Sequence, residues 1–248
     1  RGASGPHYIT SLGSAPLDAR SKLLQSCTTM QVEPADAIFH QFARIADALS
    51  SPSRLKLMDR LCQGEQTVEH LAEAAGLSVS NASRQLRILA ECRLAEVRRD
   101  PPRVYYRVAG ERVVRFWFSL RELAREQLSE LDRIMVDLVA GRDSLLPISR
   151  DELLAKMQTG EVVVVDVRPE AEFRAAHIPG SLSIPVEQLE ARLAAIPSGK
   201  QVVAYCRGPY CLLSVDAVEV LRSRGIPAVR LEDGVPEWRA AGLPLQTA

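Results

Sequence analysis

Two hydrophobic patterns divide the chain. In the first half, apolar side chains recur every three or four residues, which predicts amphipathic helices with one buried face. These segments are 35–49, 55–61, 67–75, 79–91 and 111–138. In the second half, short apolar runs at 162–165 and 202–204 alternate with helix-like segments at 189–195 and 214–223. Such runs predict a mostly parallel sheet, so we expect a multidomain chain with a mainly α N-terminal domain and an α/β C-terminal domain.

Three of the predicted helices have the layout of a helix-turn-helix unit. A serine cap followed by Pro52 starts the first helix. Segments 67–75 and 79–91 follow as two helices joined by a short turn that contains Gly76. Residues 94–108 then form two alternating stretches around a proline-containing turn, which predicts a β-hairpin wing.

Polar and basic side chains gather where this layout would meet DNA. Between residues 78 and 107 there are seven arginines and three acidic residues, although the whole chain has zero formal net charge. A local positive excess attracts phosphates, and the outer face of the second helix can reach base edges in the major groove. The candidate DNA-binding residues are Ser80, Asn81, Ser83, Arg84, Gln85 and Arg87 on that helix and Arg98, Arg99 and Arg103 in the wing. A solvated charged face is the alternative interpretation.

Two flanking helices have the pattern of dimerisation elements. Apolar residues at helical spacing occur over 35–49 and over 111–138, and the second segment is predicted to be one continuous helix. It is too long and too apolar for a small winged domain to cover. We therefore expect it to pack against the same helix of a second subunit in a homodimer.

The segment 48–108 resembles the winged-helix repressors of the arsenic- and metal-sensing ArsR/SmtB family. The resemblance is carried by the Ser-Pro-Ser-Arg helix start, by Val68 with Leu71 in the next helix, and by the Arg-Val-Tyr-Tyr-Arg wing. It implies a homodimer that binds a double-stranded DNA operator.

The metal-binding cysteines of the best-known arsenic repressors are absent from this sequence. The positions that carry Cys-Val-Cys in those proteins are Thr67, Val68 and Glu69 here. Cys62 and Cys92 form no close local pair, so we interpret them as core or semi-buried thiols and expect no metal site.

A cysteine lies where the second half of the chain turns from a strand into a helix. The apolar run 202–204 ends shortly before Cys206, and a helix-like segment starts near Leu212. Free N–H groups at a helix N-terminus and the adjacent Arg207 favour an anion. We therefore expect Cys206 to be a thiolate nucleophile in a turn that is open to solvent.

Four motifs in register make residues 147–248 similar to the rhodanese domain. They are Asp166-Val167-Arg168-Pro169, His177-Ile178-Pro179-Gly180-Ser181, the Cys206 turn and Gly234-Val235-Pro236-Glu237-Trp238. The resemblance implies that Cys206 carries sulfane sulfur taken from thiosulfate, a persulfide or a polysulfide, and it implies no cofactor. The loop expected to cradle the terminal sulfur is Arg207, Gly208, Pro209, Tyr210, Cys211 and Leu212. Asp166 and Arg168 are expected to brace the loops.

Cys211 departs from the family pattern, because many sulfurtransferases of this family have an arginine at the corresponding position. The missing cation weakens the case for efficient thiosulfate turnover. A second thiol could instead attack a Cys206 persulfide, which would release sulfide and leave a disulfide within the loop. In the alternative interpretation, Cys211 only packs at the start of the helix.

Composition fits a chain of two domains. No apolar run is long enough to cross a bilayer, so no membrane association is expected, and five unevenly spaced cysteines favour a reducing cytoplasm. The expected divisions are a flexible leader with an expression remnant (1–33), a DNA-binding and dimerisation domain (34–140), a linker (141–147) and a rhodanese-like domain (148–248).

These features together predict a dimeric DNA-binding transcriptional repressor whose C-terminal domain senses or carries reactive sulfur on Cys206. A second hypothesis is an active sulfurtransferase that the winged helix merely locates or dimerises. A third is a loop like that of arsenate reductases or phosphatases, although bulky Pro209 and Tyr210 suit a small sulfur better than a tetrahedral oxyanion.

Overall fold

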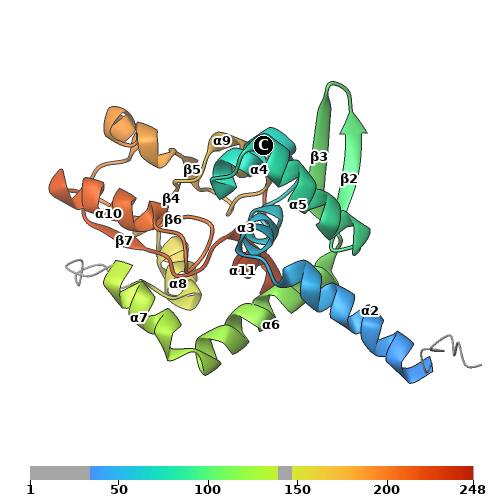
Figure 1. The fold of residues 1–248 in the computed structure, drawn as a ribbon. Coiled ribbons are helices and arrows are strands. Elements are labelled where there is room, and N and C mark those ends of the chain that lie inside the picture. Colours follow the sequence, from blue (N-terminus) through green and yellow to red (C-terminus); the bar gives the residue numbers. More distant parts are fainter. Residues whose placement is uncertain (1–33, 139–146, 248) are drawn as a thin grey trace, which may run out of the picture. The chain divides into compact units, whose positions relative to one another are not determined.

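The computed structural model describes residues 34–138 and 147–247 (Figure 1). The expected leader at 1–33 and most of the expected linker therefore lie outside the described residues. None of the described helices combines the length and the apolar character that a bilayer-spanning helix needs.

The helix-turn-helix and the wing predicted from the sequence are confirmed. The helices are α3 (Pro52–Leu61), α4 (Val68–Ala75) and α5 (Val79–Glu91), and the hairpin β2 (Ala95–Asp100) and β3 (Arg103–Val108) extends away from them (Figure 1). A short strand that the sequence pattern does not predict, β1 (Gln66–Thr67), pairs with β3 and completes a three-stranded sheet.

Side-chain caps and a left-handed glycine set the two helix boundaries around the turn. The Thr67 hydroxyl accepts from the backbone N–H of His70 at the start of α4, and the Ser78 hydroxyl accepts from that of Asn81 at the start of α5. Gly76 ends α4 with φ of 66°, a conformation that glycine adopts without strain. Fully buried leucines from all three helices form the core of this domain: Leu57, Leu61, Leu71, Leu86 and Leu89.

The helix predicted over 111–138 is two helices, so that prediction is wrong in one respect. The first, α6, spans Glu111–Gln127, and the second, α7, spans Ser129–Leu138. Leu128 between them is extended, with φ of −118° and ψ of 90°. Acidic residues in the first turn of α7 favour a new helix N-terminus there, and Arg125 reaches Asp132 across the break at 3.5 Å.

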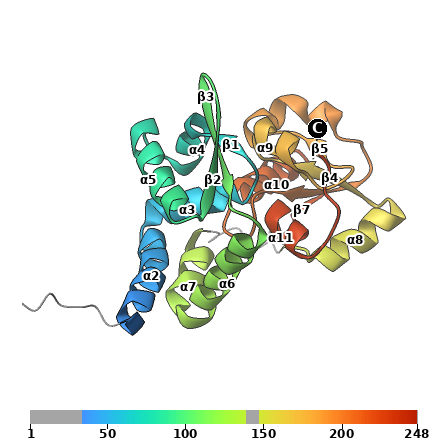
Figure 2. The same cartoon turned by 90° about the vertical axis from the view of Figure 1, so that its right-hand side faces the viewer.

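The C-terminal domain is built on a parallel sheet, as predicted. Its strands, in the spatial order β5-β4-β6-β7, are β5 (Leu182–Ser183), β4 (Val162–Asp166), β6 (Gln201–Tyr205) and β7 (Ala228–Arg230) (Figure 1). The surrounding helices are α8 (Arg150–Thr159), α9 (Glu170–Ala175), α10 (Leu213–Ser223) and α11 (Val235–Ala240) (Figure 2). The helix predicted at 189–195 is a pair of 3₁₀ turns, η1 (Val186–Gln188) and η2 (Glu190–Ala195).

Alternation along the buried strands divides this domain into two apolar layers. Val165 and Val202 belong to the layer that contains α10, whereas Val164 and Val203 belong to the layer that contains α8 and α11. Trp238 of α11, which is 2% exposed, anchors the second layer.

A fully buried ion pair ties the end of β4 to the rest of the domain. The Arg168 guanidinium donates from Nε to Asp166 Oδ1 at 2.9 Å and from Nη2 to Asp166 Oδ2 at 2.6 Å, and both residues are inaccessible to solvent. Its Nη2 also donates to the Ala176 carbonyl at 2.7 Å. This bidentate geometry suits the bracing role expected from the sequence.

We predict that Arg168→Met destabilises the C-terminal domain by about 3–5 kcal/mol, because the Asp166 carboxylate would remain buried without its counter-charge. Urea unfolding followed by tryptophan fluorescence, in a Trp117→Phe background so that only Trp238 reports, measures the change. Arg174→Met is the matched control, since Arg174 makes an exposed pair with Glu170 and should leave the midpoint nearly unchanged. Equal midpoints for the two variants would contradict a stabilising role for the buried pair.

Candidate functional site

The cysteine loop connects β6 to α10 and holds its two thiols in different environments. Cys206 is only 2% exposed. Its Sγ lies 3.3 Å from the Cys211 carbonyl oxygen and 3.2 Å from the Ser214 hydroxyl oxygen, and both contacts suit a thiol that donates. The expectation that Cys206 lies in a turn open to solvent is therefore wrong, because the loop folds back over the strand end. Cys211 is half-buried.

The same environments shift the pKa values of the two thiols in opposite directions. Burial raises the pKa of Cys206 well above its usual range. A hydrogen bond from the Cys206 thiol, together with the backbone N–H groups of Arg207 and Leu213, lowers the pKa of Cys211 to about 6. Burial is the largest cause of the raised pKa of Cys206, although hydrogen bonds from the Ser214 hydroxyl and backbone N–H oppose it, whereas the Cys206 thiol and the backbone donors favour the anion on Cys211.

Arg207 does not point its charge at the thiols as the sequence suggested. Its Nη2 donates to Glu172 Oε1 at 2.6 Å and its Nε to Glu172 Oε2 at 2.9 Å. Burial alone would raise the pKa of Glu172, but the interactions with His70 and Arg207 lower it to about 2. The Arg207 charge is therefore shared with a buried carboxylate.

Two glycines allow α11 to approach the loop. A Cβ at Gly234, at the start of α11, would lie 2.4 Å from the Arg207 carbonyl carbon. Gly208 has φ of +131°, and a Cβ there would lie 2.9 Å from Glu237 Oε2. The path of the loop is thus fixed by packing against α11.

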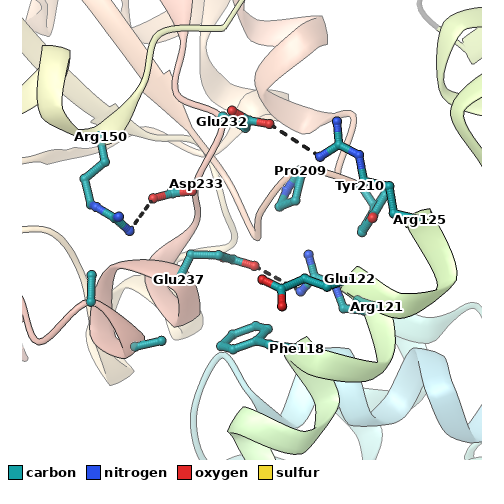
Figure 3. A pocket seen from close by; sticks show the side chains of 12 residues that line it. Phe118, Arg121, Glu122, Arg125, Arg150, Pro209, Tyr210, Glu232, Asp233 and Glu237 are labelled. Carbon is teal, nitrogen blue, oxygen red and sulfur yellow. Dashed lines mark hydrogen bonds and ion pairs between the residues drawn. The ribbon is translucent and has the colours of Figure 1, made fainter.

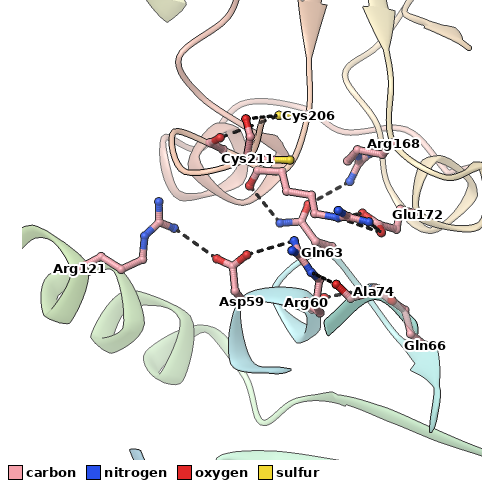
Figure 4. Close-up of polar contacts among 12 residues, drawn as sticks. Asp59, Arg60, Gln63, Gln66, Ala74, Arg121, Arg168, Glu172, Cys206 and Cys211 are labelled. Carbon is pink, nitrogen blue, oxygen red and sulfur yellow. Dashed lines mark hydrogen bonds and ion pairs between the residues drawn. The ribbon is translucent and has the colours of Figure 1, made fainter. Parts of the chain in front are cut away.

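The winged-helix domain contacts this loop through a buried glutamine (Figure 4). Gln63, between α3 and β1, is fully buried. Its Nε2 donates to the Arg207 carbonyl at 3.1 Å, and its Oε1 accepts from Arg168 Nη1 at 3.1 Å. His70 Nε2 of α4 lies 3.8 Å from Glu172 Oε1. Sequence reasoning missed these residues, because no local pattern marks a partner 144 positions away.

A second set of contacts joins α6 to the same region. Arg121 Nη1 lies 3.0 Å from Glu237 Oε1, and its guanidinium carbon lies 4.9 Å from the Tyr210 ring centroid. Both Arg121 and Tyr210 line a cavity of about 490 Å³ that also includes Phe118 and Arg150 (Figure 3). They also line a much smaller cavity, of about 30 Å³, beside Cys211.

The predicted DNA-facing residues of α5 separate into two groups. Ser80, Arg84 and Arg87 are exposed, and Asn81 and Ser83 are partly exposed. Gln85 is buried, contrary to its predicted place on the outer face. It lies on the same side of α5 as the buried residues Ala82 and Leu86, and this side packs on α3. Its amide is also occupied, since Oε1 accepts from Arg54 and Nε2 donates to Asn81, both at 3.1 Å.

The arginines of the wing also differ from one another. Arg98 pairs with Glu65 at 2.7 Å and with Asp100 at 3.2 Å, and it lies over the Tyr105 ring, so its charge is largely compensated. Arg99 and Arg103 are exposed and have no carboxylate partner within residues 34–138 and 147–247. Their positive charges are therefore available to interact with a DNA phosphate.

The remaining described thiols have the character of core residues. Cys62 is 1% exposed, and burial raises its pKa to about 12. Cys92 is half-buried at the end of α5. In the part of the chain that the structure describes, no group of three or more His, Cys, Asp and Glu side chains could hold a metal ion.

Comparison with known proteins assigns both halves of the chain. Residues 51–97 match the family described as bacterial regulatory protein, arsR family, and residues 149–241 match the rhodanese-like domain. The HTH-type transcriptional regulator Rv0324 of Mycobacterium tuberculosis is 42% identical over 209 residues, which are 84% of this chain and 92% of that protein. A sulfurtransferase of Allochromatium vinosum is 34% identical over 88 residues, which are 35% of this chain and 80% of that protein.

A solved structure is similar to the N-terminal half. It is the homodimeric winged helix-turn-helix DNA-binding domain of Mb0332 from Mycobacterium bovis, 39% identical, covering 41% of this chain and 94% of that one with a TM-score of 0.37. The match to Rv0324 extends over nearly all of that protein and includes both of its halves. The chain therefore belongs to the arsR family of bacterial regulatory proteins, in a form that carries a C-terminal rhodanese-like domain.

Proposed function

We propose that this protein is a homodimeric, DNA-binding transcriptional repressor whose operator affinity depends on reactive sulfur carried by the Cys206–Cys211 loop. The observation that carries the proposal is the burial of Gln63, a winged-helix residue, between the Arg207 carbonyl and the Arg168 guanidinium. Arg207 directly follows Cys206, so a change at the thiols changes the partner of a buried side chain of the DNA-binding domain.

The DNA-binding part of the proposal rests on α5 and the wing. Exposed Arg84 and Arg87 share a face with Ser80, as expected of a helix that enters the major groove. Arg99 and Arg103 supply cations at the wing, where phosphates lie in complexes of this geometry.

The dimeric part rests on apolar side chains that stay exposed in a single chain. On α2 (Pro34–Leu49) these are Ile38, Phe39 and Phe42, and on α6 and α7 they include Leu123, Ile134 and Val136. None of the ten residues of α7 is buried, although the helix has an apolar face. A second copy of the chain would remove these side chains from water.

The coupling part follows from the two thiols. Sulfur uptake gives a persulfide, and attack by the second thiol turns it into a disulfide that changes the backbone path of the loop. The modified and unmodified states must differ in their affinity for DNA, and such couplings are typically about 1–3 kcal/mol.

A sulfurtransferase is the second candidate, supported by the Allochromatium vinosum relative that covers this domain. Steady-state turnover with thiosulfate and cyanide distinguishes the two. Rapid turnover that leaves DNA binding unaffected would favour the enzyme, whereas a sulfur-dependent change in operator affinity with little turnover would favour the sensor.

Replacing Arg84 or Arg87 with Ala is predicted to weaken binding to DNA that the wild-type protein selects from a random-sequence library. Loss of a base contact should weaken the binding free energy by about 1–3 kcal/mol, whereas Arg103→Ala should reduce the slope of log binding constant against log salt concentration by about 1. Fluorescence anisotropy at several salt concentrations measures both. Arg192→Ala, an exposed arginine of the C-terminal domain, is the control. Unchanged binding by all three variants would remove α5 and the wing from the DNA interface.

Gln63→Leu should separate sulfur uptake from DNA release. The variant keeps the volume of the buried side chain but loses both of its hydrogen bonds to the C-terminal domain, so the loop should still be modified by polysulfide while the change in operator affinity is lost. Mass spectrometry and anisotropy on the same sample measure the two effects. Gln66→Leu is the matched control, because Gln66 is buried but donates to Arg60 within its own domain. A wild-type response from Gln63→Leu would refute this route of coupling.

A further inference from the structure

Side chains of the winged-helix domain cover the outer side of the cysteine loop. Gln63 is fully buried and donates to the Arg207 carbonyl at 3.1 Å, directly after Cys206 (Figure 4). Arg121 of α6 lies with its guanidinium carbon 4.9 Å from the Tyr210 ring centroid. The loop is therefore enclosed by its own strand and helix on one side and by a second domain on the other.

The space left between the two domains beside Cys211 is too small for a sulfur donor. Its volume is about 30 Å³, roughly the share of one water molecule in the liquid. Asp59, Arg60 and Arg121 close it on the side of the winged-helix domain. A hydropersulfide or thiosulfate has several heavy atoms, so neither fits while the domains lie in this arrangement.

The larger cavities around the loop do not reach its thiols. A cavity of about 490 Å³ is lined by Tyr210 at the tip of the loop, and another of about 470 Å³ is lined by Arg207 and Leu213 at its ends. Neither of them is lined by Cys206 or Cys211. Cys206 is 2% exposed and does not line the smallest cavity either. Sulfur transfer to Cys206 therefore requires a change in the structure.

Polar contacts hold the two domains together at this place. Arg121 Nη1 lies 3.0 Å from Glu237 Oε1, and His70 Nε2 lies 3.8 Å from Glu172 Oε1. Two side-chain nitrogens among these groups, His70 Nε2 and Arg121 Nε, are buried without a hydrogen-bond partner in the described part of the chain. Burying an unpaired polar group costs stability, and water would supply partners if the domains separated. Polar interfaces between domains of one chain commonly permit such motion.

We propose that the winged-helix domain is a lid over the sulfur site, and that Cys206 takes up sulfur only after the two domains separate. The lid is the surface formed by Asp59, Arg60, Gln63 and Arg121. This inference rests on the proposed function, in which the loop carries sulfur. It makes the movement of the DNA-binding domain a part of the loading step itself, so a ligand that favours the closed arrangement slows loading.

The loading step balances without a further oxidant. In the open arrangement, the Cys206 thiolate attacks the terminal sulfur of a hydropersulfide, R–S–SH. A bond forms between Cys206 Sγ and that sulfur, the bond between the two donor sulfurs breaks, and its electron pair leaves on RS⁻. RS⁻ takes the proton that the Cys206 thiol released, so the products are the Cys206 persulfide and RSH.

One close contact allows the lid to be wedged open from outside the loop. Gly64 follows Gln63 and packs so closely on α9 that a Cβ there would lie 2.9 Å from Ala175 Cβ. A leucine in place of Ala175 should therefore push the winged-helix domain away from the C-terminal domain. Ala171→Leu is the matched control, because Ala171 is an exposed residue of the same helix and lines a cavity of about 660 Å³.

Glutathione hydropersulfide is mixed with the full chain, and mass spectrometry of the loop peptide follows the sulfur taken up, counted as persulfide plus loop disulfide. A minor open state is typically populated at roughly 0.1–10%, so Ala175→Leu should load at least about tenfold faster than the wild type. Ala171→Leu should load at the wild-type rate. Arg121→Met, which loses the ion pair with Glu237, is a second opening variant and should also load faster. Circular dichroism checks folding, and alkylation of half-buried Cys92 should be the same in all four proteins.

The outcomes separate the lid from the proposed function. Loading at or below the wild-type rate in both folded opening variants would overturn the lid, and access to Cys206 would then come from motion of the loop alone. Equal acceleration by Ala171→Leu and Ala175→Leu would also overturn it, because only the second residue contacts the lid domain at Gly64. No loading of the loop in any of the four proteins would overturn the proposed function as well.

Discussion

A buried network of two guanidinium groups and two carboxylates holds the site together. Asp166 pairs with Arg168, Glu172 pairs with Arg207, and Gln63 lies between the two pairs. Charges enclosed in protein are tolerated only when each has a partner at short range and its remaining hydrogen bonds are satisfied. The positions of β4, α9 and the cysteine loop are therefore tied to one another by electrostatics rather than by apolar packing alone.

The network also explains why the DNA-binding domain and the loop share one site. Gln63 donates a hydrogen bond to the Arg207 carbonyl of the loop and accepts one from the Arg168 guanidinium. Leaving either of these buried groups without a hydrogen-bond partner would lower the stability of the fold. His70 adds a contact between α4 and Glu172. Since α4 precedes the turn of the helix-turn-helix, the non-covalent contacts that start at the loop end on the helix next to the one that carries Arg84 and Arg87.

Within the loop, two identical functional groups have different surroundings. Burial is the largest cause that raises the pKa of Cys206, and hydrogen bonds from the Ser214 hydroxyl and backbone N–H offset it only in part. The Cys206 thiol and the backbone N–H groups of Arg207 and Leu213 instead favour an anion on Cys211. One loop therefore holds two thiols that differ in burial and in charge.

Local sequence determined most of the elements. The spacing of apolar residues, the caps at Thr67 and Ser78 and the proline-containing turn of the wing predict the helix-turn-helix and the hairpin, because each depends on neighbours a few residues apart. The apolar runs before Asp166 and Cys206 predict the parallel strands for the same reason. The cysteines and the motifs around them were sufficient to find the loop.

Only the tertiary structure decided which of those residues lie where the chemistry takes place. Gln85 has the polarity of an exposed residue, but its face of α5 packs on α3 and is buried. Arg207 pairs with Glu172, which is 35 positions away in the sequence but adjacent in the folded chain. The burial of Cys206 and the contacts of Gln63 depend on surfaces that meet only after folding. Sequence periodicity reports the local backbone, whereas burial and electrostatic partners are set by long-range packing.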